Sequence, residues 1–436
     1  MLNYFGFKEK NTNLKIEIFG GITTFLTMSY IIFVNPVILA AAGMDADAVR
    51  VATCVSAAIG TFLMGILANY PIAQAPAMGH NAFFAFVVCG TMGYTWQQAL
   101  GAVFISGSIF VIMSIFKLWT GLVKAIPDSL KHSIAVGIGL LIAIIGMEYG
   151  GLIVDNPATF IGLGDLSSPA VIITIVGLVV TAILMARKIP GAILWGLLVA
   201  AVVAVMFDVV EYQGVFSMPP SIEPTFLKLD LAGTLKTGII PIIFVFFFLD
   251  LFDTMGTLVG VSTQAGFFKD GNLPRANRAM LADSIATITG AALGTSTVTS
   301  YIESTTGIAQ GARTGFANVV TAILFLLALF VNPLAQMIGG TYQGSMHPVI
   351  APALIIVGYF MMRSVVHINW EKITEAIPAF LTMIIMPFTF SITEGIAFGF
   401  ISYAFLKLVS GEARQVHWII YLFAILFIIR YIFLAQ

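Results

Sequence analysis

The sequence predicts an all-α polytopic membrane protein, a prediction that rests on composition, on the lengths of the apolar runs and on the distribution of basic residues. Of the 436 residues, 59% are hydrophobic and only 9% are charged, whereas about a quarter of the residues of a soluble domain are charged. A chain of this composition is solvated by lipid. An ordinary cytosolic enzyme is therefore excluded.

The charge balance and the cysteine and histidine patterns exclude other classes. The formal net charge is −1, so no basic field is available to hold nucleic acid. The two cysteines, Cys54 and Cys89, lie in apolar runs without a CxxC or metal-ligand spacing, and the five histidines form no HExxH pair. The sequence also has no GxSxG motif. We therefore expect no nucleic-acid partner, no metal, no cofactor and no enzymatic activity.

Fourteen segments are expected to cross the membrane, because about 20 mostly apolar residues suffice for a spanning helix. The first, about 16–42, is too long and too polar for a signal peptide, which predicts a retained helix. The others are 51–69, 74–90, 98–116, 131–149, 168–186, 190–207, 238–261, 276–294, 300–312, 315–337, 348–362, 376–390 and 393–409. A last apolar stretch, 417–435, is compatible with a fifteenth span, an interfacial helix or a packed tail.

The basic residues give an independent test of this segmentation. With the N-terminus in the cytoplasm, 16 of the 20 Lys and Arg residues fall on the cytoplasmic side, as the positive-inside rule requires. Only Arg50, Lys228 and Lys236 fall on the opposite side, and Arg430 lies in the ambiguous tail. The distribution predicts an even number of spans up to residue 410, with both ends cytoplasmic.

Two of the fourteen segments are expected to be broken. The third begins with Pro71 and Pro76 before it becomes apolar and helical at 82–88, and the tenth begins with the hydroxyl-rich run 295–300 before a helical stretch at 304–310. β-Branched residues favour extended backbone, so each segment is interpreted as a short strand followed by a half-helix. Because the two segments are seven spans apart, we expect two inverted seven-helix repeats with a midplane binding site.

The eighth span contains the most informative acidic residues, since ionisable groups at membrane depth are costly and usually functional. Asp250 and Asp253 are three residues apart and share a helix face, which Thr254 extends. In a low dielectric each carboxylate disfavours the charged form of the other, which suits a proton-loading site. Asp250 is favoured for direct contact with a ligand. The alternative for Asp253 is a bond to the backbone of the tenth segment.

The two broken segments supply further candidates. Glu303 lies where the tenth segment becomes helical, where helix N-terminal amides would hold its carboxylate, and Asn81 is expected at the mirrored junction of the third segment. A capping role alone is the alternative for both. If the half-helices face each other, Asn81, Asp250 and Glu303 converge at the centre of the membrane.

Weaker candidates surround these positions. His80 is a proton-bearing or stacking group, or a hydrogen-bonded structural histidine. Phe83 could stack on a planar ligand, although core or lipid packing is the default. Thr299 belongs to the hydroxyl run. Asp283, in the ninth span, could be a buried acid, but a structural pairing with a helix or with a cytoplasmic base is the favoured alternative.

At these residues the sequence resembles the AzgA-like purine permeases, a branch of the nucleobase–cation symporters. The matching stretches are Asn35-Pro36, APAMGHNAFFAF at 75–86, DLFDTMGTLVGV at 250–261, ADSIATITGAALGTSTVTSYIESTTGIAQGARTG at 282–315 and PAFLTMIIMPFTFSITEGIAFGFISY at 378–403. The resemblance covers essentially the whole chain. One departure is His80, which stands where family members usually have leucine.

The resemblance implies fourteen spans in two inverted repeats, divided into a core domain (1–117 and 237–340), a gate domain (118–236 and 341–410) and a tail (411–436). It also implies proton-coupled import of hypoxanthine, guanine or adenine across the plasma membrane. Substrate contacts carry over to Asn81, Asp250 and Glu303, with Asp253 nearby. Relatives of this architecture often form homodimers.

The chemistry of the acidic residues is compatible with that implication. A buried carboxylate can accept two N–H groups of a purine edge, and an asparagine can pair with a carbonyl or a ring nitrogen. Coupling follows if Asp250, Asp253 or Glu303 must be protonated before the base binds. The alternatives are uracil or xanthine as substrate and, with less support because no Lys or Arg lies mid-span, an inorganic anion.

Overall fold

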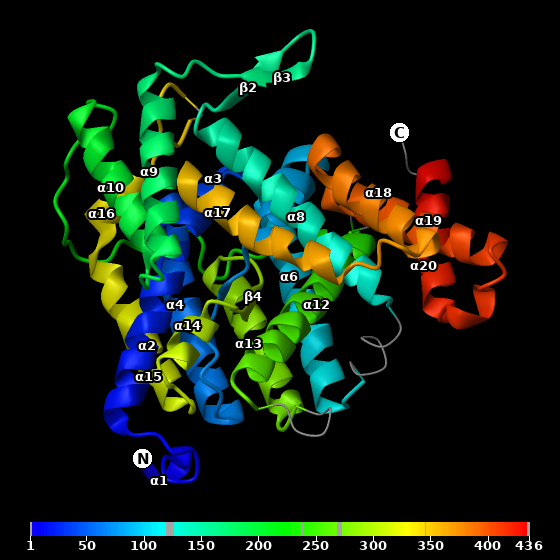
Figure 1. The fold of residues 1–436 in the computed structure, drawn as a ribbon, viewed down its shortest axis with the longest axis horizontal. Helices are drawn as coiled ribbons and strands as arrows, with labels where there is room; N and C mark the ends of the chain where they lie inside the picture. Colours follow the sequence, from blue (N-terminus) through cyan, green and yellow to red (C-terminus); the bar gives the residue numbers. More distant parts are fainter. Residues whose placement is uncertain (1, 119–125, 237–238, 268–272, 345, 434–436) are drawn as a thin grey trace. The chain divides into compact units, whose positions relative to one another are not determined.

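The computed structural model describes residues 2–118, 126–236, 239–267, 273–344 and 346–433, and its ribbon is drawn in Figure 1. The chain divides into two compact units, each described here by itself. The first comprises Met1–Lys117 and Gly146–Ala353, and the second comprises Leu118–Ile145 and Leu354–Gln436. Lys124 and Lys269, both assigned to the cytoplasmic side by the predicted orientation, lie outside the described residues.

Within the described residues, the first unit contains most of the helices and four short strands. In chain order it has α1 (Leu2–Phe5), α2 (Leu14–Met28), α3 (Ile31–Ala40), α4 (Ala46–Leu63), a π-helical turn (Met64–Ala68), β1 (Gln74–Pro76), α5 (Met78–Ala82), a second π-helical segment (Phe83–Thr91), α6 (Trp96–Ile115), the end of α8 (Asp128–Tyr149), β2 (Ile153–Asn156), β3 (Phe160–Leu163), α9 (Pro169–Ala186), α10 (Ala192–Met206), α11 (Leu231–Lys236), α12 (Ile240–Gln264), α13 (Ala276–Leu293), β4 (Val298–Ser300), α14 (Ser304–Ala309), α15 (Phe316–Leu327), a 3₁₀ turn (Ala328–Phe330), α16 (Asn332–Gly339) and the start of α17 (Ala351–Met362).

Several helices begin where the sequence supplies a capping side chain. Asp45 accepts a hydrogen bond from the Ala48 N–H at 2.8 Å and starts α4. Thr95 and Gln98 form a reciprocal capping box at the start of α6. α9 begins with Pro169, which lacks the N–H that a first helical turn leaves unpaired.

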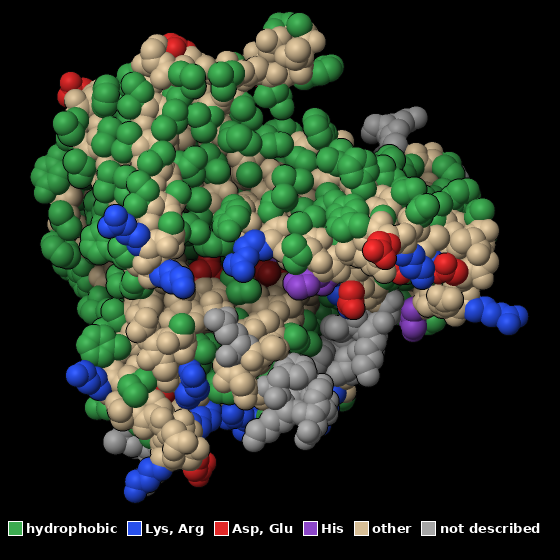
Figure 2. All heavy atoms as spheres, in the orientation of Figure 1, with side chains coloured by type: hydrophobic (Ala, Val, Ile, Leu, Met, Phe, Trp, Pro, Cys, Tyr) green, Lys and Arg blue, Asp and Glu red, His purple; other side chains and the backbone are tan. Residues whose placement is uncertain are grey.

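Seven helices of the described residues are long and apolar enough to cross a membrane: Leu14–Ala40, Ala46–Ala68, Trp96–Ile115, Asp128–Tyr149, Pro169–Ala186, Ile240–Thr263 and Ile392–Val409. A bent pair, Phe316–Phe330 with Asn332–Gly339, makes an eighth candidate with a bend of 79°. Hydrophobic side chains cover much of the surface over α9 and α10 in Figure 2. Val179 and Ile183 of α9 and Val202 of α10 are among the exposed apolar residues of these helices. Such faces suit contact with lipid tails.

The two segments expected to be broken each contain a short strand followed by a helix, as the sequence predicted. β1 leads into α5, and β4 leads into α14 after a three-residue turn. The strands pair antiparallel, with Gln74 opposite Ser300, Ala75 opposite Thr299 and Pro76 opposite Val298. The pair is buried along its whole length, so its backbone groups need each other as partners.

A second strand pair, β2 with β3, was not anticipated from the sequence. It forms an antiparallel hairpin in which Ile153 lies opposite Leu163 and Asn156 opposite Phe160. The Asn156 side chain accepts hydrogen bonds from the N–H groups of Ala158 (2.9 Å) and Thr159 (3.2 Å), which closes the turn.

The second unit is built mainly from the C-terminal helices. It contains the first part of α8, the remainder of α17, a 3₁₀ turn (Arg363–His367), α18 (Ile373–Thr389), α19 (Ile392–Val409), a short 3₁₀ turn (Ala413–Gln415) and α20 (Trp418–Phe433). Phe390 has a φ of 49° and ends α18 in the left-handed region, which allows α19 to begin two residues later. Val136, Ile368, Ala379 and Met383 form a buried hydrophobic cluster within the unit.

The tail that the sequence left open is an α-helix that packs along α19. The Phe400 ring contacts Phe423 and Phe427 at centroid distances of 5.8 and 6.2 Å. Near the other end, the Tyr431 hydroxyl donates to Glu394. The start of α19 therefore contacts the end of α20, so the two helices run antiparallel. Residues 434–436 and the Arg430 side chain lie outside the described part of the chain.

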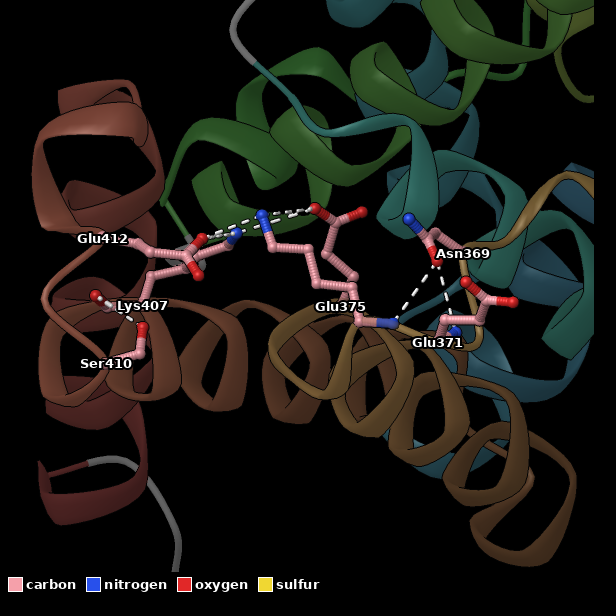
Figure 3. Close-up of polar contacts among 7 residues, drawn as sticks. Asn369, Glu371, Glu375, Lys407, Ser410 and Glu412 are labelled. Carbon is pink, nitrogen blue, oxygen red and sulfur yellow. Dashed lines mark hydrogen bonds and ion pairs between the residues drawn. The ribbon is translucent and has the colours of Figure 1, made fainter.

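An ion-pair cluster joins the start of α18 to the end of α19, and Figure 3 shows Glu375, Lys407 and Glu412 pointing toward one another. The buried Lys407 ammonium lies 2.6 Å from Glu412 and 3.6 Å from Glu375. Lys372 lies 2.9 Å from Glu412. Hydrogen bonds from Lys372 and Lys407 lower the pKa of the Glu412 carboxyl, and the bond to Glu412 raises the pKa of Lys372.

These shifts predict a pH window for the cluster. A carboxyl whose pKa is lowered by folding stabilises the protein above its unfolded pKa of about 4.3 and loses that effect as the pH falls through the folded value. The Glu412→Gln variant should therefore melt at a lower temperature than the parent at pH 7, with the difference shrinking below about pH 4. Thermal unfolding in detergent measures this. Glu371→Gln, an exposed neighbour whose carboxylate forms no ion pair among the described residues, is the matched control. An equal effect of that control would contradict the assignment.

Candidate functional site

The strand pair places hydroxyl side chains of β4 against two different helices. Successive strand residues point to opposite faces, so Thr299 and Ser300 separate. The Thr299 hydroxyl donates to the Asp253 carboxylate on α12 at 3.2 Å, and the Ser300 hydroxyl donates to Asp283 on α13 at 3.2 Å. The strand thus lies between two acidic positions that are 30 residues apart in sequence.

Asp253 lies on the open side of the site. Its side chain is exposed within the chain, and its bond to the tenth segment is to the Thr299 hydroxyl rather than to the backbone. Further along the same face of α12, a Cβ added at Gly256 would meet no described atom within 4 Å, and a Cβ at Gly260 would meet, among the described residues, only the tip of Ile302 at 3.9 Å. This face of α12 therefore offers room for a ligand beside the Asp253 carboxylate.

Asp250 is buried behind that face. It is fully buried, and one oxygen accepts a hydrogen bond from the Thr287 hydroxyl at 3.1 Å. Its second oxygen has no hydrogen-bond partner among the described residues. The sequence favoured Asp250 for direct ligand contact, but the structure presents Asp253 to open space instead. The two carboxylates belong to one helix and face different environments.

Asp283 forms the other half of a buried acidic pair with Asp250. It is fully buried, accepts a hydrogen bond from the Gln74 side chain at 2.8 Å, and lies close enough to Asp250 for side-chain interaction. Asp283 is thus the buried acid that the sequence allowed. The favoured pairing with a cytoplasmic base is not found within the described residues, where its partners are Gln74 of β1 and Ser300 of β4.

Thr254 and Phe83 are buried around these acids. Thr254 is fully buried beside Asp283. Phe83 is also fully buried, and its ring meets Phe246 edge-on with a centroid distance of 4.9 Å. Phe83 therefore packs α12 against the third segment, and its faces are occupied by protein.

Glu303 does not cap α14, contrary to the expectation that helix amides hold its carboxylate. Its φ and ψ of −56° and −20° are already helical, and its side chain makes no capping hydrogen bond, whereas a capping side chain requires extended backbone at that position. Instead, the Tyr30 hydroxyl donates to the Glu303 carboxylate at 2.6 Å. Glu303 is 9% exposed and close enough to Asp253 for electrostatic interaction.

Asn81 lies one turn inside α5 and not at the helix junction. The N-cap of α5 is Ala77, and the fully buried Asn81 side chain accepts a hydrogen bond from the Ser296 hydroxyl. Its amide nitrogen has no hydrogen-bond partner among the described residues, and the same holds for Nε2 of the buried His80 ring. The third segment thus provides an unused donor and an unused ring nitrogen beside the strand pair.

The assembled site is acidic and polar without a compensating cation. None of its four acidic side chains forms an ion pair within the described part of the chain. Hydroxyl, amide and carboxyl groups are the functional groups supplied by α5, α12, α13, β4 and the start of α14. Such groups can bind an uncharged polar molecule through hydrogen bonds and can carry a proton.

Sequence reasoning alone missed three partners of the site. These are Tyr30, which holds Glu303, Ser296, which holds Asn81, and Gln74, which holds Asp283. Each contact joins segments more than 200 residues apart. A single sequence gives no signal for pairings of that kind.

Broken segments that meet inside a bundle of apolar helices are the hallmark of secondary transporters, and this is the class that the fold and the site define. The chain belongs to the Permease family, whose model matches residues 15–398. It is a multi-pass membrane transporter and not an enzyme.

Comparisons with curated proteins agree with this membership. The chain is 50% identical to a putative permease of Methanocaldococcus jannaschii, over 99% of this chain and 98% of the relative. It is 46% identical to the guanine/hypoxanthine permease PbuG of Bacillus subtilis over the full length of both. It is 44% identical to the adenine permease AdeP of Escherichia coli, over 99% of this chain and 95% of the relative.

Solved structures show the same fold at low sequence identity. The transmembrane domain of the cyanobacterium bicarbonate transporter BicA aligns with a TM-score of 0.62 at 15% identity, covering 89% of this chain and 97% of that one. SLC26A9 aligns with a TM-score of 0.63 at 12% identity, covering 94% of this chain and 66% of that one.

Proposed function

We propose that this chain imports purine nucleobases, namely hypoxanthine, guanine or adenine, by proton symport with alternating access. The observation that carries the proposal is the convergence of Asp253 and Glu303 beside the β1–β4 pair, where neither carboxylate has an ion-pair partner among the described residues. Two full-length relatives are permeases for guanine/hypoxanthine and for adenine. An inorganic anion, by contrast, would be repelled by these carboxylates.

The substrate contacts follow from what each side chain offers. Asp253 and Glu303 accept ring N–H groups of the base, and a carboxylate can accept two such donors at once. The unpaired amide nitrogen of Asn81 donates to a carbonyl or ring nitrogen. The sequence favoured Asp250 for direct contact with the base. In this proposal Asp253 makes that contact instead, because its carboxylate lies beside open space. Thr299 orients that carboxylate, and His80 contributes from the third segment.

Proton coupling rests on the acids that lie close together. Two ionised carboxylates at short distance in a low dielectric are unstable, so Asp250 and its neighbour Asp283 hold a shared proton more readily than two negative charges. Asp253 and Glu303 are the other proton-coupling residues. Protonation lowers the charge of the empty site, the neutral base then binds, and the two cross together. The proton is the coupling ion and no cofactor takes part.

The architecture expected from the sequence is part of this proposal. Fourteen spans form two inverted seven-helix repeats, with core segments at 1–117 and 237–340 and gate segments at 118–236 and 341–410, followed by the tail. The proposed core and gate are the parts that move relative to each other during transport. The two compact units, by contrast, are defined by how the chain packs, so their bounds are different. Both ends are cytoplasmic at the plasma membrane, and two copies associate through the gate. The antiparallel β1–β4 pair supports the inversion, since inverted repeats run in opposite directions.

Uptake measurements test the transport function. The chain is expressed in a strain that lacks purine permeases, and uptake of radiolabelled hypoxanthine is measured against unlabelled adenine, guanine, xanthine and uracil. Competition by purines is expected. Stronger competition by uracil or xanthine than by hypoxanthine, guanine or adenine would overturn the proposed substrates. Accumulation of hypoxanthine that persists in the presence of a proton ionophore would overturn proton symport.

The geometry also predicts how the two aspartates of α12 differ. Asp253→Asn should raise the half-saturating purine concentration by about 10- to 100-fold, because one charge-assisted hydrogen bond is lost. Asp250→Asn should instead lower accumulation while leaving competition between bases unchanged. Purine binding to purified protein separates the two effects. Weaker binding in the Asp250 variant than in the Asp253 variant would reverse the proposed roles.

A further inference from the structure

The second unit contains a polar cavity that the transport function does not use. It is open to the surface and has a volume of about 560 Å³. Its lining includes the buried Tyr403 of α19 and four exposed residues: Arg414 and Gln415 of the following 3₁₀ turn, His417, and Trp418 at the start of α20. A volume of this size falls within the range of roughly 300–1,000 Å³ that small-molecule sites occupy.

The cavity carries positive charge without a protein partner. Arg414 forms no ion pair or hydrogen bond within the described residues. The nearest acidic residue in sequence, Glu412, is engaged by Lys372 at 2.9 Å and Lys407 at 2.6 Å, as Figure 3 shows for Lys407. His417 uses one ring nitrogen to accept from the Ile419 N–H at 3.4 Å. A ligand for this cavity is therefore expected to be an anion.

An exposed apolar stripe begins at the cavity wall and continues along α20. Spacings of three and four residues place its members on one face: Trp418 is 64% exposed, Leu422 41%, Ile425 55%, Ile429 43% and Ile432 68%. The other face of α20 packs on α19. A polar, basic cavity and an apolar surface are thus continuous, which suits an amphiphile with an anionic head.

We propose that the cavity binds the headgroup of an anionic phospholipid, with the acyl chains along the exposed face of α20. The Arg414 guanidinium pairs with the phosphate through two parallel hydrogen bonds, Gln415 and His417 bind the remaining polar groups, and Trp418 marks the level of the interface. A free phosphate would use the basic residues but not the apolar stripe. Basic pockets at a membrane surface bind anionic lipid headgroups by the same physics.

Native mass spectrometry of the full chain tests the proposal. The protein is purified in detergent with equal amounts of phosphatidylglycerol and phosphatidylcholine, and retained lipid is counted. Phosphatidylglycerol should be retained in preference. Retention should fall about fivefold in Arg414→Gln, because one basic residue near the membrane surface contributes roughly that factor. It should fall further in Arg414→Gln with His417→Gln, which also removes the imidazole ring, and less in Arg414→Lys, which keeps the charge but loses one of the two parallel hydrogen bonds. Arg363→Gln, an exposed arginine of the same unit outside the cavity, is the matched control.

Other outcomes would overturn the lipid assignment. Equal retention of the two lipids, or an equal loss in Arg363→Gln, would remove the specific headgroup site. Displacement of phosphatidylglycerol by millimolar inorganic phosphate alone would identify a free-anion site. A change of oligomeric state in Arg414→Gln without a change in lipid retention would identify a second copy of the chain as the occupant.

Discussion

Replacing Glu303 with alanine is expected to reduce purine uptake to background while the protein still reaches the membrane. The carboxylate is the group at the end of the strand pair that faces both Tyr30 and Asp253, and its loss removes a charge-assisted acceptor that contributes about 1.5–3 kcal/mol per hydrogen bond. Radiolabelled hypoxanthine uptake, normalised to the amount of protein in the membrane, measures the effect.

Two further variants make this result specific. Glu303→Gln keeps the shape and removes the charge, so it should also fail to accumulate substrate. Tyr30→Phe removes the hydroxyl that donates to Glu303 but leaves the carboxylate, so uptake should fall only partly, by about tenfold. Near-normal uptake in Glu303→Ala would remove Glu303 from the site. If Tyr30→Phe abolished uptake as completely as Glu303→Ala, the Tyr30 hydroxyl and not the Glu303 carboxylate would be the essential group.

Gly315→Val is expected to prevent accumulation of folded protein. A Cβ at Gly315 would lie 2.0 Å from the Gly65 carbonyl oxygen and 2.7 Å from the Gly65 Cα. Both contacts are with backbone, so no side-chain rotation relieves them. Overpacking of this kind costs about 1–3 kcal/mol for small insertions, and a branched side chain adds to it. Fluorescence-detected size-exclusion chromatography measures the folded fraction.

Gly256→Ala is the matched control for the glycine prediction. It adds a Cβ where no atom of the residues that the structure describes lies within 4 Å, and alanine is favoured over glycine inside a helix by about 1 kcal/mol. Its folded fraction should equal or exceed that of the parent. If Gly315→Val folds as well as this control, the close approach of the segments at Gly65 and Gly315 is not required for folding.

The segment boundaries show how much the sequence predicts. The runs at 98–116, 168–186 and 393–409 became α6, α9 and α19 within a few residues, because apolar length determines which segments partition into lipid. The strands of the broken segments were also predictable, since Pro76 and the hydroxyl run disfavour helix over a few local residues. The β2–β3 hairpin depends on a turn held by Asn156 and was missed.

The different burial of the two aspartates of α12 could not be predicted from the sequence. Spacing places Asp250 and Asp253 on adjacent parts of one helix, but the rotation of α12 against α13 decides which of them is covered. The Thr287 hydroxyl of α13 lies on the Asp250 side, so Asp250 is buried and Asp253 is open. No local pattern encodes that rotation.

The partners of the acidic residues show the same limit at longer range. The position of Glu303 before a helical stretch favoured a cap, yet its own backbone is helical and its carboxylate accepts a hydrogen bond from Tyr30, 273 residues away. For Asp283 the sequence favoured pairing with a helix or a cytoplasmic base over a buried acid, yet it is buried and accepts a hydrogen bond from Gln74, 209 residues away.

The sequence by itself determined that the chain is a membrane protein, where its helices lie and which two segments are interrupted, because solvation by lipid and backbone preference act over a few neighbouring residues. Only the tertiary structure decided which carboxylate is open, which acids share a buried pair and which side chains hold them. Those choices depend on how helices and strands distant in sequence pack against one another.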